Sequence, residues 1–199
     1  MAGELNALGL VEVAAKIRTR DASCVEVLDA VLARAKAVQP KLNAFLRIDE
    51  DLAREQAKLY DAEATKRRMR GPLHGVPLAH KDMYYREGVP SSCGSKIKGN
   101  EPEKTTATAL KRLDAAGAIQ FGVLNMAEFA YGPTGHNGHF GHVRNPWNTA
   151  HITDGSEMAG VIFDPNARRI APISRESRPP NCPVASRSAA SDRAPSRSI

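Results

Sequence analysis

The sequence predicts an α/β fold followed by a disordered tail. In residues 1–150, amphipathic helical segments alternate with short apolar segments. This alternation is typical of layered folds, in which helices cover the faces of a sheet. Hydrophobic residues make up 42% and charged residues 25% of the chain, as in an ordinary globular protein. The periodic patterns stop after about residue 152, so the folded part is expected to end near there.

Two amphipathic helices are predicted near the N-terminus. The first carries apolar side chains at helical spacing from Ala7 to Ile17. The second is expected to begin after Ser23, because Ser23 and Glu26 have the spacing of a capping box, in which each side chain accepts a hydrogen bond from the other residue's backbone N–H. Pro40 is expected to end this helix, since a proline ring obstructs the helical backbone.

Three further elements are predicted before the middle of the chain. Residues 42–48 alternate apolar and polar side chains, which predicts a strand. Residues 50–70 combine many charges with good helix formers, which predicts an exposed helix ended by Gly71-Pro72. Residues 76–80 form a short apolar run, which predicts a buried strand.

The last predicted elements lie in the segment that precedes the glycine-rich region. Thr106 can cap a helix that Gly117 ends. Residues 118–124 form another short apolar run and are expected to be a strand. Residues 126–131 are expected to form a short helix.

The C-terminal tail has a composition that does not support a folded core. Arg, Ser, Pro and Ala account for 24 of the 32 residues from 168 to 199. Such a segment buries too little apolar surface to offset the entropy lost on ordering it, so disorder is expected. GC-rich DNA translated out of frame gives the same composition. A frameshift near Thr153 is therefore a second interpretation, which the coding DNA would test.

Charge and composition argue against several classes of protein. The net charge of +6 is spread along the chain rather than concentrated in a long basic run, so nucleic acid is not an expected partner. No apolar stretch approaches the roughly 18 residues that a membrane span needs, and the N-terminus lacks the features of a signal peptide. Three widely separated cysteines without a C-x-x-C pair indicate free thiols and a cytoplasmic protein.

Lys81 is the first candidate for a catalytic residue. It is expected at the end of an apolar strand, where side chains commonly meet a substrate crevice. A lysine amine normally has a pKa of about 10.4, so it is a poor base at neutral pH unless burial lowers that pKa. Asp82 would raise the pKa if its carboxylate faced the amine. From these residues alone, a catalytic base and a surface ion pair are both open interpretations.

A glycine-rich run with three histidines, at positions 136, 139 and 142, raises the question of a metal site. No carboxylate or cysteine is interleaved, and the spacing fits no usual zinc pattern. The glycines are not followed by the Lys-Ser/Thr pair of a phosphate-binding loop. We expect no metal and no cofactor here, and interpret the glycines as permitting tight turns that line a site.

Five short segments carry a resemblance to a known family. They are GPLHGVPLAHKDM (71–83), TATALKRLDAAGAI (106–119), NMAEFAYG (125–132), FGHVRNPW (140–147) and the pair Gly155-Ser156. In order and spacing they resemble the amidase-signature family, which includes acyl-amide hydrolases and the A subunit of tRNA-dependent amidotransferases. The resemblance predicts a partial amidase-signature domain in residues 1–156 and a tail outside the family in residues 157–199.

The resemblance also implies a fold and a set of catalytic groups. The family's domain is a large mixed sheet flanked by helices, of which this chain would hold roughly the first third. Its triad consists of two serines and a lysine. Lys81 aligns with the lysine, which must be neutral to accept a proton, and Ser156 aligns with the serine that relays this proton. The family's Gly-Gly-Ser-Ser-Gly-Gly motif is reduced here to Gly155 and Ser156.

The third member of the triad is not recognisable in the sequence. The resemblance places a nucleophilic serine about two dozen residues beyond Ser156, in a loop that also forms the oxyanion hole. The corresponding region, near Pro179-Pro180, contains no such motif. We therefore expect an inactive amidase fragment, from a family that hydrolyses small-molecule carboxylic amides through an acyl-serine.

Two other interpretations of the sequence remain open. One is a fragment similar to an amidotransferase A subunit, which releases ammonia from glutamine for tRNA-linked Glu or Asp. The other is a non-enzymatic basic interaction protein. The sequence does not predict an oligomeric state.

Overall fold

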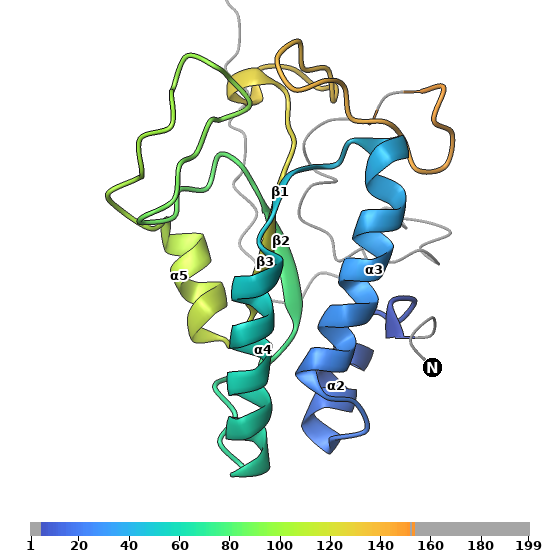
Figure 1. The fold of residues 1–199 in the computed structure, drawn as a ribbon, viewed down its shortest axis with the longest axis vertical. Coiled ribbons are helices and arrows are strands. Elements are labelled where there is room, and N and C mark those ends of the chain that lie inside the picture. Colours follow the sequence, from blue (N-terminus) through green and yellow to red (C-terminus); the bar gives the residue numbers. More distant parts are fainter. Residues whose placement is uncertain (1–4, 152, 154–199) are drawn as a thin grey trace, which may run out of the picture. The chain divides into compact units, whose positions relative to one another are not determined.

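The computed structural model describes residues 5–151 and residue 153 (Figure 1). It confirms the predicted α/β class. The elements are α2 (Leu10–Thr19), α3 (Cys24–Leu42), β1 (Phe45–Ile48), α4 (Glu50–Thr65), β2 (Pro77–Lys81), α5 (Thr108–Ala115), β3 (Ile119–Leu124) and the 3-10 helix η1 (Glu128–Ala130). Ser156 and the predicted tail lie outside the described residues. Among the helices described, none is long and apolar enough to cross a membrane.

The three strands form one mixed sheet in the order β1-β3-β2. β2 runs parallel to the central strand β3, with Pro77 opposite Ile119 and Lys81 opposite Leu124. β1 runs antiparallel to β3 and pairs Phe45 with Leu124. Because parallel strands end at the same edge of a sheet, Lys81 and the loop that follows Leu124 lie at the same edge.

Helices α3 and α4 pack against each other and against the sheet (Figure 1). Ile119 and Phe121, two residues apart on β3, point to the same face and join the core there. The ring centroids of Phe45 and Phe121 lie 5.7 Å apart. The buried core also contains Val13, Ile17, Val27, Leu28, Leu32, Ala53, Ala57, Tyr60 and Val76. This packing fixes the strand that ends at Lys81.

The start of α3 is held by its own cap and by a neighbouring helix. The Glu26 N–H donates to Ser23 Oγ over 3.1 Å, and the Ser23 N–H donates to Glu26 Oε2 over 2.8 Å, which confirms the predicted capping box. The next two N–H groups, of Cys24 and Val25, donate to the carboxylate of Asp61 on α4 over 2.7 and 3.1 Å. These four bonds satisfy donors that a helix terminus leaves without partners.

Two predicted helix ends were wrong. Pro40 lies inside α3, which continues to Leu42 and ends at Asn43 in the left-handed conformation, with φ of 52°. A proline in the last turn interrupts one hydrogen bond without preventing the chain from completing that turn. α4 ends at Thr65 rather than at residue 70, because Arg67 adopts a left-handed φ of 59°.

The region between β2 and η1 also differs from the prediction at two points. Thr106 does not cap α5: the N-cap position is Ala107, and the Thr106 hydroxyl instead accepts a hydrogen bond from the Glu87 N–H over 3.1 Å. The expected helix over 126–131 is a single 3-10 turn, because Phe129 and Ala130 both have left-handed φ angles. Gly117, with φ of 89°, follows α5 as predicted.

Gly75 sits at a close contact that places the start of β2 against α3. Its φ is +78°, and a Cβ at this position would lie 2.2 Å from Cys24 Sγ. Gly88 has almost the same φ, +77°, but has no atom within 4 Å of its hypothetical Cβ. An alanine at Gly88 would therefore introduce backbone strain alone, whereas an alanine at Gly75 would introduce the same strain and a steric collision.

We predict that Gly88→Ala lowers the free energy of unfolding by about 1 kcal/mol, the cost of a left-handed alanine. Gly75→Ala should cost about 3 kcal/mol or more, because the new methyl group also collides with Cys24. Urea denaturation measures both. The double variant Gly75→Ala/Cys24→Ala should recover part of the loss. Equal costs at the two glycines would contradict the close contact.

Candidate active site

Lys81 is the last residue of β2, and its side chain is almost completely buried, with 7% of its surface exposed. Its amine forms no ion pair or hydrogen bond with the residues that the structure describes. Burial lowers the pKa of the Lys81 amine below its ordinary value of 10.5. Because the charged form is the one that loses hydration on burial, the fraction of neutral amine at any given pH is increased.

Asp82 follows Lys81 but is turned towards a different partner. Its carboxylate accepts hydrogen bonds from the N–H groups of Ser92 and Gly94, over 3.0 and 3.3 Å, and from the Ser92 hydroxyl. The Ser91 hydroxyl donates to the Asp82 carbonyl oxygen. Asp82 therefore anchors the loop after β2, and it is not among the groups that shift the pKa of Lys81.

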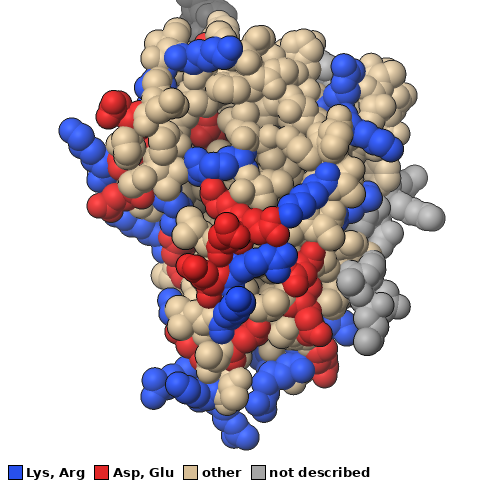
Figure 2. Space-filling view, in the orientation of Figure 1, with Lys and Arg blue, Asp and Glu red and all other residues tan. Residues whose placement is uncertain are grey.

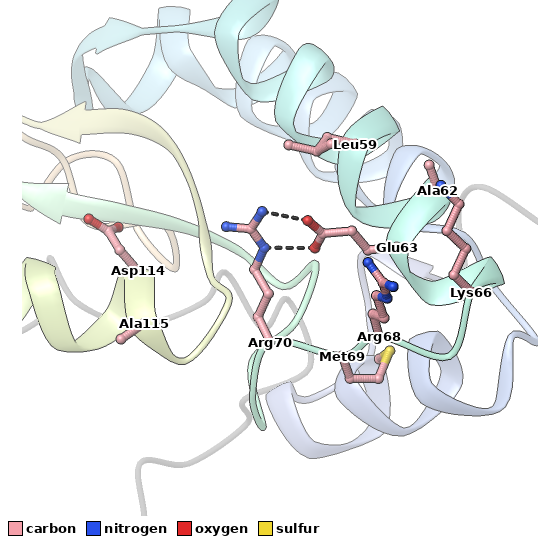
Figure 3. Close-up of a pocket in the computed structure, with 9 residues that line it drawn as sticks. All are labelled: Leu59, Ala62, Glu63, Lys66, Arg68, Met69, Arg70, Asp114 and Ala115. Carbon is pink, nitrogen blue, oxygen red and sulfur yellow. Dashed lines mark hydrogen bonds and ion pairs between the residues drawn. The ribbon is translucent and has the colours of Figure 1, made fainter.

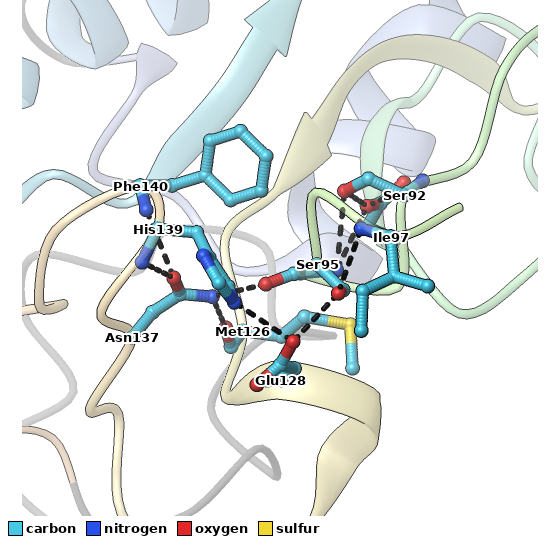
Figure 4. Close-up of polar contacts among 10 residues, drawn as sticks. Ser92, Ser95, Ile97, Met126, Glu128, Asn137, His139 and Phe140 are labelled. Carbon is cyan, nitrogen blue, oxygen red and sulfur yellow. Dashed lines mark hydrogen bonds and ion pairs between the residues drawn. The ribbon is translucent and has the colours of Figure 1, made fainter. Parts of the chain in front are cut away.

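Asn137 joins three loops at this end of the sheet (Figure 4). It is 2% exposed, and its side-chain amide donates to the carbonyl oxygens of Gly94 and Met126, each over 2.7 Å. Its side-chain oxygen accepts from the N–H groups of His139 and Phe140, over 2.7 and 2.9 Å. One amide group thus satisfies four backbone groups in segments that have no regular secondary structure.

Glu128 forms a second junction beside Asn137. Its carboxylate accepts hydrogen bonds from the buried Ser95 hydroxyl over 2.6 Å and from His139 Nε2 over 2.8 Å (Figure 4). The hydrogen bonds from Ser95 and His139 hold the pKa of the Glu128 carboxyl below its usual value. Together with Asp82, the two junctions link the loop after β2, η1 and the glycine-rich segment.

Asn125 ties the start of this network to the end of α3. The Asn125 side chain donates to the carbonyl oxygens of Asn43 and Gly141, each over 3.1 Å, and accepts from the Met126 N–H over 2.8 Å. Asn43 in turn donates to the carbonyl oxygen of Phe140 over 2.9 Å. The loop after β3 is therefore held against the end of α3.

The three histidines of the glycine-rich run are engaged in this local network. His139 binds Glu128, as described above, and His142 Nδ1 accepts from the Asn137 N–H over 3.0 Å. His136 Nδ1 pairs with the Thr134 hydroxyl over 2.9 Å. Within residues 5–151 and 153, no group of three or more His, Cys, Asp or Glu side chains is arranged to hold a metal ion.

Sequence reasoning found Lys81 but missed the residues that organise its surroundings. Asn125 and Glu128 fall in a segment that carried the family resemblance, and no role was inferred for either. The position of Asn137 in a glycine-rich loop could have indicated its role, since the backbone groups of such a loop need side chains as hydrogen-bond partners. Ser156, the other predicted site residue, lies outside the described residues, so its role stays a prediction.

A separate hollow of about 640 Å³ lies away from these loops (Figure 3). Arg70 donates two hydrogen bonds to the Glu63 carboxylate in it, from Nε over 2.7 Å and from Nη2 over 2.6 Å. Its lining residues are Leu59, Ala62, Glu63, Lys66, Arg68, Met69, Arg70, Asp114 and Ala115. None of these residues belongs to the loops that follow β2 and β3. The hollow is therefore separate from the candidate active site at Lys81.

Comparison with known proteins shows the family to which the chain belongs. The chain is 41% identical over 152 residues to the A subunit of the glutamyl-tRNA(Gln) amidotransferase of Ectopseudomonas mendocina, a match that covers 76% of this chain and 31% of the relative. The corresponding protein of Pseudomonas aeruginosa PAO1 is 40% identical over the same length. The chain thus spans about a third of the length of these relatives.

Solved structures give the same result. A crystal structure of an amidase superposes with a TM-score of 0.70 at 37% identity, covering 75% of this chain and 34% of that one. The peptide amidase of Stenotrophomonas maltophilia superposes with a TM-score of 0.64 at 29% identity, covering 71% and 30%. A model of the Amidase family matches residues 26–157. The chain therefore belongs to the amidase-signature family and contains part of its domain.

Proposed function

We propose that this chain contributes the base of an amide-hydrolysing site, with Lys81 as the proton acceptor. The observation that supports this role is the burial of its amine at a strand end, with no charged partner among the described residues and with its pKa lowered by burial. A lysine that serves as a base needs an accessible neutral form, which burial favours and an adjacent carboxylate would oppose.

Ser156 completes the proposed proton path. Its hydroxyl would pass a proton to the neutral amine of Lys81 while taking one from a nucleophilic serine. That serine would bond to the amide carbonyl carbon, the C–N bond would break, and the amine would leave with the proton. Water would then hydrolyse the acyl-serine. Because residues 157–199 contain no recognisable nucleophile motif, we expect the chain alone not to complete this cycle.

The proposed substrate is a small-molecule carboxylic amide. A second candidate is the side-chain amide of glutamine, as in an amidotransferase A subunit, and it is favoured by the 41% identity to such a protein. Genes for partner subunits beside the coding gene would favour the second candidate. For either substrate, we propose that the domain extends over residues 1–156 and works in the cytoplasm.

A chimeric enzyme tests the role of Lys81. Residues 1–153 of this chain would replace the matching part of the Ectopseudomonas mendocina protein, so that both serines come from the relative. We predict that the chimera releases ammonia from glutamine or hydrolyses a generic aryl amide. Lys81→Met should lower kcat about 10³-fold or more, because the base is lost.

Lys111→Met is the matched control for this experiment, since Lys111 is an exposed lysine of α5. It should leave the activity of the chimera unchanged. An active chimera that retains its rate after Lys81→Met would contradict the proposed role of Lys81.

The pH dependence of stability provides a test on the chain itself. Because the folded state lowers the pKa of Lys81, the folded chain releases this proton at a lower pH than the unfolded chain. The burial cost is therefore present in full below the lowered pKa and is relieved as the pH rises towards 10.5. We predict that Lys81→Met raises the free energy of unfolding at pH 7 and that this gain shrinks as the pH approaches 10.5.

Urea denaturation at several pH values measures this gain. Lys111→Met should change stability by less than about 0.5 kcal/mol at every pH, as exposed substitutions usually do. A Lys81→Met variant that is less stable than the wild type at pH 7 would show instead that the amine has a stabilising partner.

A further inference from the structure

The hollow at the end of α4 is lined by more positive than negative side chains. Its charged lining residues are Lys66, Arg68, Arg70, Glu63 and Asp114. All three cations come from the turn that follows α4, in which four of the five residues from 66 to 70 are basic. Figure 2 shows mostly Lys and Arg side chains at the lower end of α4, whereas positive and negative side chains alternate higher along the helix. The hollow therefore carries an excess of positive charge.

Both acidic residues of the hollow are already paired with an arginine. Glu63 accepts one hydrogen bond on each carboxylate oxygen from Arg70, over 2.7 and 2.6 Å (Figure 3). Asp114 also accepts one on each oxygen, from Arg86, over 3.1 and 3.0 Å. With both oxygens occupied, neither carboxylate is well placed to pair with a second cation.

Lys66 and Arg68 have no acidic partner in the part of the chain that the structure describes. Their side chains form no ion pair or hydrogen bond with any residue there, and both residues are exposed. Two positive charges in the hollow are therefore unbalanced. A phosphate monoester carries a charge of about −1.5 to −2 at pH 7 and offers three strong acceptor oxygens. It matches both the size of the excess charge and the donors that Lys and Arg present.

The backbone of the turn brings Lys66 and Arg68 to the hollow but not Arg67, which lies between them. Arg67 has a left-handed φ of 59°. Its N–H donates to the Ala64 carbonyl oxygen, and the Arg68 N–H donates to that of Glu63, each over 2.9 Å. These bonds also occupy two of the last carbonyl groups of α4, whose partial negative charge would otherwise oppose an anion.

Arg70 forms a fixed wall of the hollow. Its two hydrogen bonds to Glu63 hold the plane of the guanidinium group, which lies 4.4 Å from the centroid of the Tyr60 ring. Tyr60 is itself 1% exposed, so the ring cannot turn away. An arginine held in this way loses little further conformational entropy when a ligand binds beside it.

The hollow also has an apolar part. Leu59 and Met69 line it with side chains that are 52% and 37% exposed, and Ala62 and Ala115 complete that part. The volume of about 640 Å³ lies within the range of small-molecule sites, roughly 300–1,000 Å³. A bare ion would leave most of this space and its apolar lining uncovered.

We propose that this hollow binds a small phosphate monoester, with its phosphate on Lys66 and Arg68 and its apolar group against Leu59 and Met69. A small molecule fits better than RNA, because the basic residues are concentrated in one turn, whereas a nucleic-acid backbone is bound by a basic patch or stripe that follows it. The proposal is independent of the function proposed for Lys81, which lies outside the lining of the hollow.

Phenyl phosphate is the probe for this site, titrated into the 199-residue chain at low ionic strength by isothermal calorimetry. We expect saturable binding of one molecule per chain. Inorganic phosphate, which lacks the ring, should bind about 5- to 10-fold more weakly, because it covers no apolar lining. Phenol, which lacks the phosphate, should show no binding. In NMR spectra, the amide resonances of Ala62 and Ala115 should shift with phenyl phosphate.

Two neighbouring arginines provide a matched pair of variants. Arg68→Gln should weaken the binding of phenyl phosphate at least about 10-fold, because it removes a charge-assisted hydrogen bond. Arg67→Gln removes the same charge one residue away, outside the hollow, and should change the affinity less than about 2-fold. Leu59→Ala should reduce the preference for phenyl phosphate over inorganic phosphate. All three side chains are exposed, and thermal denaturation verifies that the variants are folded.

Three outcomes would overturn the proposal. The first is the absence of saturable binding with phenyl phosphate at concentrations up to about 10 mM. The second is an equal loss of affinity in Arg67→Gln and Arg68→Gln, which would show that the basic turn attracts anions without a defined site. The third is an RNA oligonucleotide without a terminal phosphate that binds more tightly than phenyl phosphate, which would identify a surface for a nucleic-acid backbone.

Discussion

The burial of one amine at the end of β2 is the constraint around which the described structure is organised. A lysine with 7% of its surface exposed loses hydration, and no described carboxylate compensates for that loss. The neighbouring Asp82 could have done so, but its carboxylate is occupied by the backbone of Ser92 and Gly94. Because the Asp82 carboxylate does not face Lys81, it does not raise the pKa of the Lys81 amine. The same carboxylate holds the loop that follows β2.

The loops around Lys81 are ordered by side chains rather than by secondary structure. Asn125, Asn137 and Glu128 bind backbone carbonyls, backbone N–H groups and two other side chains. Buried backbone groups in irregular segments have to be paired, and an amide side chain can serve as both donor and acceptor. The loops can therefore hold a defined arrangement while leaving Phe129 and Tyr131 exposed.

Local sequence patterns predicted some elements correctly, although the local signals at Pro40 and Thr106 were misleading. The capping box at Ser23, the strand that ends near Lys81 and the α/β class follow from spacing and periodicity. The turn that replaces the predicted helix over 126–131 could not be anticipated, because left-handed φ angles at Phe129 and Ala130 depend on contacts with distant loops. The role of Asn137 was inaccessible for the same reason, since its partners Gly94 and Met126 approach it only in the folded chain.

The pKa of the Lys81 amine is the quantity on which the proposed base depends most directly, and NMR can measure it in the chain itself. A pH titration of the lysine ¹³Cε resonances, with Lys81 assigned by its loss in Lys81→Met, would give this value. We predict a pKa below the ordinary 10.5, unchanged in Asp82→Asn, because burial alone causes the shift. A pKa at or above 10.5, or one that falls in Asp82→Asn, would show that the amine is paired with the carboxylate and would contradict the proposed base.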